Sequence, residues 1–169
     1  MKPCNLLSGL LALVNACLVV GRPSNSGCTR LQDGSGPVPI PDTAKSFQNS
    51  SLFSTFAVQA RAPEGWMQMY SNLSSITGTN TTGYLGFSLL ESYDTSLCSA
   101  RCLKKKNCIG INVYFERAPT VMPGLACSNP ASTTLIKCAY FASVVKKDTA
   151  INSGYKEKDF DIVYAGSNA

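Results

Sequence analysis

The sequence predicts an α+β fold in which a mainly antiparallel sheet packs on a disulfide-pinned central helix. Three observations favour this class. Residues 95–106 form a predicted helix that Asp94 can cap, and Cys98 and Cys102 lie about one turn apart on the same helix face. In residues 109–116, aliphatic or phenyl side chains alternate with Gly, Asn, Tyr and Glu, as in a strand with one buried face. Strand-like segments lie both before and after the helix, which favours an antiparallel sheet.

Because successive side chains of a strand point to opposite faces of the sheet, the sequence predicts which face each strand residue occupies. In the segment 109–116 the residues expected in the core are Ile109, Ile111, Val113 and Phe115. The other predicted strands are 66–73, 84–90, 134–142 and 160–164. Within 84–90, Leu85, Phe87 and Leu89 are expected on one face.

An N-terminal arm of different character, residues 22–64, precedes the disulfide domain at 65–169. Its proline-punctuated stretch leads to a short helix that Asp42-Thr43 can cap, and then to a second helix at 51–60. The arm is too apolar for a free linker. We therefore expect it to pack against the domain that follows.

The first residues have the layout of a secretory signal peptide, which we assign to residues 1–21. Lys2 supplies a positive start, and an apolar run of about 15 residues ends at Gly21. Cleavage after Ala16 fits the same pattern. A membrane anchor is the alternative, but a bilayer span takes roughly 20 residues. The prediction is a chain that begins near Arg22, is secreted to the extracellular space or the cell wall, and has no membrane span.

Removal of the signal peptide discards Cys4 and Cys17 and leaves an even number of cysteines. In a small secreted chain this indicates a disulfide framework. Zinc binding is the competing interpretation, but the chain has neither a Cys-x2-Cys pair nor any histidine. We expect no metal and no cofactor.

Secretion also gives meaning to the Asn-x-Ser/Thr sequences, which are acceptors for N-glycosylation. They begin at Asn49, Asn72 and Asn80. Asn80 is the best candidate, because its surroundings are polar and rich in glycine and threonine, as in an exposed loop.

Catalysis is disfavoured by the groups that the sequence lacks. Without histidine the usual general base is missing, and no Gly-x-Ser-x-Gly motif is present. Glu91 with Glu116 is the least implausible pair of carboxylates for glycoside hydrolysis. The sequence predicts that the protein is not an enzyme.

The second face of the strand 109–116 is the candidate binding surface. Asn112, Tyr114 and Glu116 form a polar row that can hydrogen-bond sugar hydroxyls and stack on a ring. The structural alternative is that Glu116 pairs with Arg117 or Arg101 and that Asn112 satisfies loop backbone.

Two further features have a structural and a functional interpretation. Trp66, the single tryptophan, belongs either to the core or to a binding platform. The net charge is +5, and the one basic run, at 104–106, closes the predicted helix, where cations are favourable. A patch for anionic polysaccharide is the alternative, and nucleic acid is not indicated.

The cysteine-bearing helix, followed by the strand Ile-Asn-Val-Tyr-Phe-Glu, resembles the PAN/Apple domain. The chain is more closely similar to a group of secreted fungal proteins with an Apple-like core. The matching stretches are 34–43, 92–98, 112–117, 129–134, 136–138 and 165–168. Apple domains bind proteins or carbohydrates and carry no chemistry, so the resemblance implies a binding module.

Spacing and resemblance together favour one disulfide pairing. The pairs are Cys102–Cys108, Cys98–Cys138 and Cys28–Cys127. The first closes a short return from helix to strand, the second pins helix to sheet as the resemblance also implies, and the third ties the arm to the domain. Exchanging Cys127 with Cys138 is the alternative.

The sequence therefore predicts a secreted, non-catalytic module that recognises a glycan or an extracellular protein, at a cell wall or a host surface. A secreted hydrolase that uses carboxylates is one alternative. A structural wall or matrix protein is the other.

Overall fold

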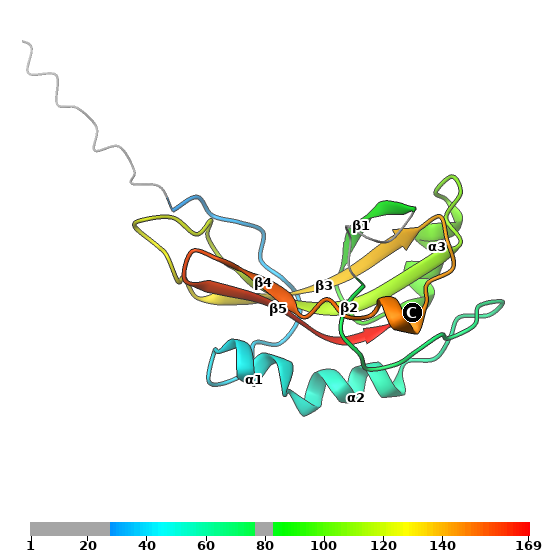
Figure 1. Ribbon diagram of the computed structural model, residues 1–169, viewed down its shortest axis with the longest axis horizontal. Coiled ribbons are helices and arrows are strands. Elements are labelled where there is room, and N and C mark those ends of the chain that lie inside the picture. Colours follow the sequence, from blue (N-terminus) through cyan, green and yellow to red (C-terminus); the bar gives the residue numbers. More distant parts are fainter. Residues whose placement is uncertain (1–27, 77–82) are drawn as a thin grey trace, which may run out of the picture.

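The fold is built on one five-stranded sheet, seen in a computed structural model that describes residues 28–76 and 83–169 (Figure 1). Every strand pairing is antiparallel, and the order is β1-β3-β2-β5-β4. The strands are β1 Tyr84–Leu90, β2 Gly110–Pro119, β3 Ser132–Phe141, β4 Gly154–Glu157 and β5 Phe160–Asn168. The α+β class and the antiparallel sheet are thus confirmed. The predicted signal peptide, residues 1–21, and Asn80 lie outside the described residues.

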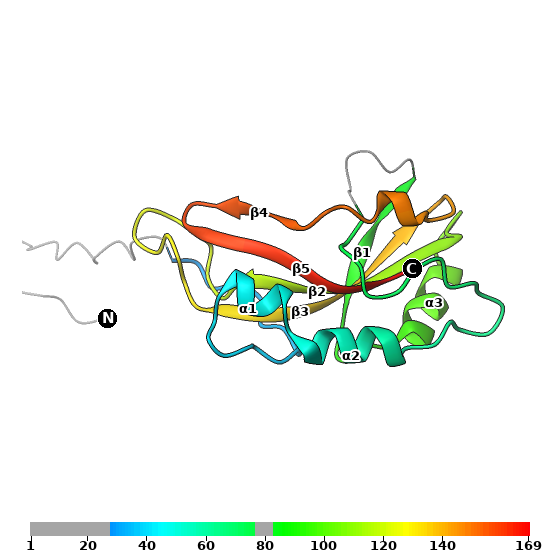
Figure 2. The same cartoon turned by 60° about the horizontal axis from the view of Figure 1, so that its bottom comes forward.

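The α-helices of the described residues are α1 Ala44–Gln48, α2 Ser51–Gln59 and α3 Thr95–Leu103, with a 3-10 turn, η1 Lys147–Thr149. Side-chain caps begin two of these three α-helices, α1 and α3. The backbone N–H of Ser46 donates to Thr43 Oγ1 at 3.1 Å, and that of Leu97 donates to Asp94 Oδ1 at 2.8 Å. α1 and α2 lie along one side of the sheet against β5 (Figure 2). No helix of the described residues has the length and apolarity needed to cross a membrane.

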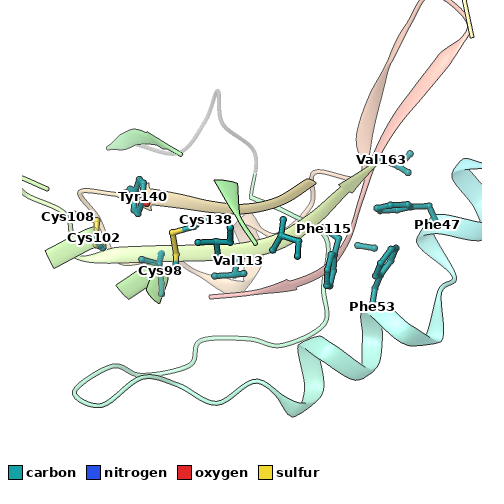
Figure 3. Packing of buried hydrophobic residues seen from close by; sticks show 14 residues of the cluster. Phe47, Phe53, Cys98, Cys102, Cys108, Val113, Phe115, Cys138, Tyr140 and Val163 are labelled. Atoms are coloured by element: carbon teal, nitrogen blue, oxygen red, sulfur yellow. A yellow bond between two sulfur atoms is a disulfide. The ribbon is translucent and has the colours of Figure 1, made fainter. Parts of the chain in front are cut away.

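The main hydrophobic core joins the N-terminal arm to the sheet. Phe53 of α2 stacks on Phe115 of β2, with ring centroids 4.4 Å apart, and meets Phe47 of α1 at 4.5 Å (Figure 3). All three rings are fully buried. The arm also contributes Asp42, whose Oδ1 pairs with the buried guanidinium of Arg117 at 2.9 Å. The arm therefore packs on the domain, as expected from its apolar character.

Disulfides fasten the core to the elements around it. The pairs are Cys98–Cys138, Cys102–Cys108 and Cys28–Cys127, as the sequence favoured. The first links α3 to β3, the second closes the return from α3 into β2, and the third ties the arm to the loop between β2 and β3. Because each of these cysteines has a disulfide partner, none of them is available to bind zinc.

The strand predicted at 66–73 is absent, so this prediction was wrong. The chain there forms no strand but lies along the end of β5, where Leu73 and Ser167 exchange two hydrogen bonds of 3.1 Å in an isolated bridge and the backbone N–H of Tyr70 donates to the Ala169 carbonyl at 3.2 Å. Asn72 has φ +55°, in the left-handed region, and this interrupts the extended backbone. The segment therefore packs against the end of the sheet without forming one of its strands.

Two face assignments also need correction. Leu85 and Phe87 do not share a face, because a β-bulge at Gly86, with φ +96°, shifts the register of β1. Leu85 packs against the main core, whereas Phe87 lies on the other face and is 49% exposed. Ile109 was expected in the core but is 57% exposed, because β2 begins only at Gly110.

The remaining differences concern element ends. α3 stops at Leu103 and not at residue 106, because the chain turns back through Asn107, with φ +62°, to bring Cys108 to Cys102. β5 continues to Asn168 beyond the predicted strand 160–164, and β4 was not predicted. β4 is short and half-exposed, so its residues show no apolar alternation.

Candidate functional site

One face of the sheet gathers tyrosines around an ion pair, and we call it the tyrosine face. Directly paired residues of antiparallel strands point to the same side. The register pairs Tyr114 with Lys137 and Glu116 with Tyr164. All five strands contribute to this face. Its members are Tyr84, Phe87, Tyr114, Glu116, Lys137, Tyr155 and Tyr164.

The tyrosine face is turned away from α1 and α2. Phe115 lies between Tyr114 and Glu116 in β2 and points to Phe53 of α2. Since successive side chains of a strand point to opposite sides, Tyr114 and Glu116 point away from that helix. The helices thus occupy one side of the sheet, and the tyrosines the other.

The floor of the face is a buried ion pair. Lys137 Nζ lies 2.5 Å from Glu116 Oε2, and the two side chains are only 13% and 8% exposed. The ammonium also sits 4.3 Å from the centre of the Phe87 ring. Burial raises the pKa of Glu116, and the neighbouring Lys137 offsets part of that effect.

The rings above this floor differ in exposure. Tyr114 is buried and meets Tyr164 edge-on, with centroids 5.3 Å apart. Tyr84, Phe87 and Tyr155 are 44%, 49% and 57% exposed. The face therefore combines fixed inner rings with outer rings that solvent or a ligand can reach.

The single carboxylate of Glu116 acts on all four phenols. Burial raises the pKa of Tyr114 most, and the negative charge of Glu116 raises it further. The same two causes, in the same order, raise the pKa values of Tyr84, Tyr155 and Tyr164. Each phenol therefore keeps its proton at neutral pH and is able to donate a hydrogen bond.

Asn112, the third residue of the predicted polar row, lies in a buried network. Its side chain is fully buried, and Nδ2 donates to Ser167 Oγ and to the Asn168 carbonyl, both at 2.7 Å. Its Oδ1 accepts from the backbone N–H of Ile76 at 3.4 Å and from Ser75 Oγ at 3.3 Å. The structural interpretation thus holds for Asn112, while Tyr114 and Glu116 lie together in the tyrosine face.

No protein-family model, curated protein or solved structure matches this chain.

The carboxylates proposed as an acid pair have separate partners. Glu91 lies after β1 and accepts a hydrogen bond from Ser35 Oγ, whereas Glu116 pairs with Lys137. Neither of the arginines considered as partners of Glu116 reaches it. Arg117 pairs with Asp42, and Arg101 donates to Ser88 Oγ and the Leu89 carbonyl. Among the described residues no group of three His, Cys, Asp or Glu side chains is arranged to hold a metal.

The other predicted residues lie at the surface or beside the core. Asn49 and Asn72 are exposed, as an N-glycosylation acceptor must be. Trp66 is half-buried and packs against the main core. The lysines at 104–106 are exposed at the end of α3, and Lys105 Nζ lies 5.3 Å from the ring centre of Tyr140.

Sequence reasoning missed most of the tyrosine face. Alternation in β2 identified Tyr114 and Glu116, but Tyr155 belongs to an unpredicted strand. Tyr164 was assigned to a strand whose register was unknown, and Tyr84 and Phe87 lie on either side of a bulge. The available signal was compositional, since tyrosines recur in the segments that form the sheet.

Proposed function

We propose that this protein is a secreted, non-catalytic module that binds a glycan through the tyrosine face. The observation that carries the proposal is the set of exposed rings, Tyr84, Phe87 and Tyr155, above the buried pair of Glu116 and Lys137. Aromatic rings can stack on the apolar faces of sugars, and neutral phenols can donate to their hydroxyls. The protein supplies both groups on one surface.

The rigidity of this surface favours recognition. The rings project from hydrogen-bonded strands, and Lys137 is held between the Glu116 carboxylate and the Phe87 ring. A site that is already ordered loses little conformational entropy when a ligand binds. Weak stacking contacts can therefore add up to useful affinity.

The proposal also includes secretion and the lack of catalytic activity. The disulfides and the signal-like first residues support an extracellular location. The chain contains no histidine, and the Glu116 carboxylate is engaged by Lys137, which leaves it poorly placed as a general base. The resemblance to PAN/Apple domains agrees with a binding role.

A depletion assay on insoluble polysaccharides tests the proposal. Purified protein is incubated with chitin, cellulose, β-glucan and mannan, and the fraction left in solution is measured. We expect saturable retention on at least one of them, and Tyr155→Ala should weaken it by about tenfold, the loss of one stacking contact worth roughly 1.4 kcal/mol. Leu125→Ala is the matched control, because Leu125 is 99% exposed in the β2–β3 loop, outside the face.

Three outcomes would contradict the proposal. Retention on none of the polysaccharides would exclude these glycans and leave an extracellular protein as the partner. Equal retention of the Tyr155→Ala variant and the wild type would place the binding elsewhere on the surface. Release of soluble sugar from a retained polysaccharide would show that the protein is an enzyme.

A further inference from the structure

A pocket lies on the other side of β2, away from the tyrosine face. Its volume is about 460 Å³, within the roughly 300–1,000 Å³ of pockets that hold small ligands. Ile111 and Val113 line it, and both point to the side of the sheet opposite Tyr114 and Glu116. It is bounded by residues 61–69, the end of α3 and the loop after β3.

The lining is apolar, and much of it is exposed. Met67, Leu103, Ile109 and Val144 line the pocket and are 79%, 72%, 57% and 59% exposed. Large apolar side chains gathered at one recess are unusual on a soluble surface and indicate a binding site. A purely structural role does not explain them, because they are not buried in the folded chain.

Positive side chains outnumber negative ones around the pocket, where Glu64 and Asp94 are the acidic residues next to its lining. Arg61 is the one charged side chain among the described lining residues, and its guanidinium makes no hydrogen bond or ion pair with the described part of the chain. The lysines at 104–106 follow Leu103 directly, and Lys146 follows Val145. An apolar recess with an unpaired arginine and a lysine-rich rim suits a ligand with an apolar tail and an anionic head.

We propose that this pocket binds a single-chain amphiphile with a carboxylate head, such as a medium-chain fatty acid. The acyl chain lies against Ile111, Val113 and Leu103, and the carboxylate pairs with Arg61. This site is separate from the tyrosine face and does not depend on the proposed glycan binding.

Trp66 provides a direct readout, because it lines the pocket and is the only tryptophan of the chain. The protein is titrated with laurate below the concentration at which laurate forms micelles, and tryptophan emission is followed. We expect a saturable change with one ligand per chain. Dodecanol and dodecyltrimethylammonium, which have the same tail with a neutral or cationic head, test the assignment of the head group.

Three variants distinguish the binding of the acyl chain from the binding of the carboxylate. Arg61→Gln should weaken laurate binding about tenfold and leave dodecanol binding unchanged. Ile109→Glu should abolish laurate binding by placing a negative charge in the apolar wall. Leu125→Glu introduces the same charge at a side chain that is 99% exposed and outside the pocket, and it should bind laurate like the wild type. If Ile109→Glu fails to fold, Val144→Glu tests the same wall.

Several results would overturn the proposal. No saturable change with laurate would exclude the ligand class, and equal affinity for laurate and dodecyltrimethylammonium would exclude the role of Arg61. Binding to vesicles of anionic phospholipid without binding of monomeric laurate would show that these exposed side chains dock on a bilayer surface instead.

Discussion

Replacing one partner of the Glu116–Lys137 ion pair should destabilise the protein much more than replacing both. The pair is buried, with side chains 8% and 13% exposed and a separation of 2.5 Å. Lys137→Met leaves a buried carboxylate without its cation, and Glu116→Leu leaves a buried ammonium without its anion. The double variant removes both charges and leaves apolar side chains of similar length.

The burial of the pair determines how much free energy of unfolding each variant should lose. Breaking a buried pair by removing one partner costs roughly 3–5 kcal/mol, whereas replacing both by apolar residues is often neutral. We expect about 3 kcal/mol for each single variant, at the low end, because Lys137 also contacts the Phe87 ring and Glu116 can take up a proton. The double variant should lie within about 1 kcal/mol of the wild type.

Guanidinium unfolding with the disulfides intact, followed by circular dichroism, measures these free energies. The pair Lys156–Asp161 is the control, because it spans β4 and β5 at 2.9 Å but its side chains are 57% and 47% exposed. Lys156→Met and Asp161→Leu should each cost less than about 1 kcal/mol, because water screens an exposed pair.

The pH dependence of Lys137→Met gives a second check. Burial raises the folded-state pKa of Glu116 above its usual 4.5. At Glu116 the folded protein then binds a proton more tightly than the unfolded chain, so the contribution of this group to stability is greatest below pH 4.5 and falls as pH rises through the folded pKa. The variant should therefore be less destabilised at pH 5 than at pH 8. Additive effects of the two single variants, or a cost of Lys137→Met that does not depend on pH, would show that the two charges are not buried as a pair.

Three further predictions concern other parts of the fold. Asp42→Asn should cost about 1–2 kcal/mol at pH 7, a low value for a bond to a charged group because the Asp42 side chain is 34% exposed. Burial alone would raise the pKa of Asp42, but hydrogen bonds from Ser132 and Arg117 lower it below 3.8, so the stabilisation is present above pH 3.8 and is lost as pH falls through the folded pKa. The stabilities of the wild type and the variant should therefore converge in an acid titration. Burial raises the pKa of Tyr70 to about 12, so its contribution to stability is fully present below pH 10 and is lost as pH rises through about 12. The ionisation of Tyr70, followed by its own ring resonance, should therefore coincide with the loss of circular dichroism in an alkaline titration, and ionisation of Tyr70 well before unfolding would contradict this. Replacing both Cys28 and Cys127 with alanine, across a sequence separation of 99 residues, should lower stability by about 4–5 kcal/mol on the chain-entropy model, and an unchanged guanidinium midpoint would show that the arm is held without it.

The parts of the fold that were predictable from sequence depend on neighbours along the chain. Asp94 caps α3 within three residues, and the alternation of β2 is set by its own backbone. The Cys102–Cys108 pair spans six positions, so its reach could be judged from spacing. Such features are local, and local periodicity and capping chemistry determine them.

The site depends on pairings between distant segments, which local patterns do not contain. Alternation predicted the side of the sheet for Asn112 but not its burial, because Ser75 and Asn168 cover it from two other regions of the chain. Lys137 became the partner of Glu116 through the β2–β3 register, whereas sequence proximity suggested Arg117. A one-residue slip in that register would turn Lys137 to the other face.

Nuclear magnetic resonance of the tyrosine rings tests directly whether the tyrosine face binds a glycan. The protein is labelled at tyrosine and titrated with a soluble oligosaccharide from the polysaccharide that retains it. We expect the resonances of Tyr84, Tyr155 and Tyr164 to shift with saturation, while that of Tyr140, in the core on the helix side, stays unchanged. Saturable shifts confined to Tyr140, or no tyrosine shift while the oligosaccharide binds, would contradict this expectation.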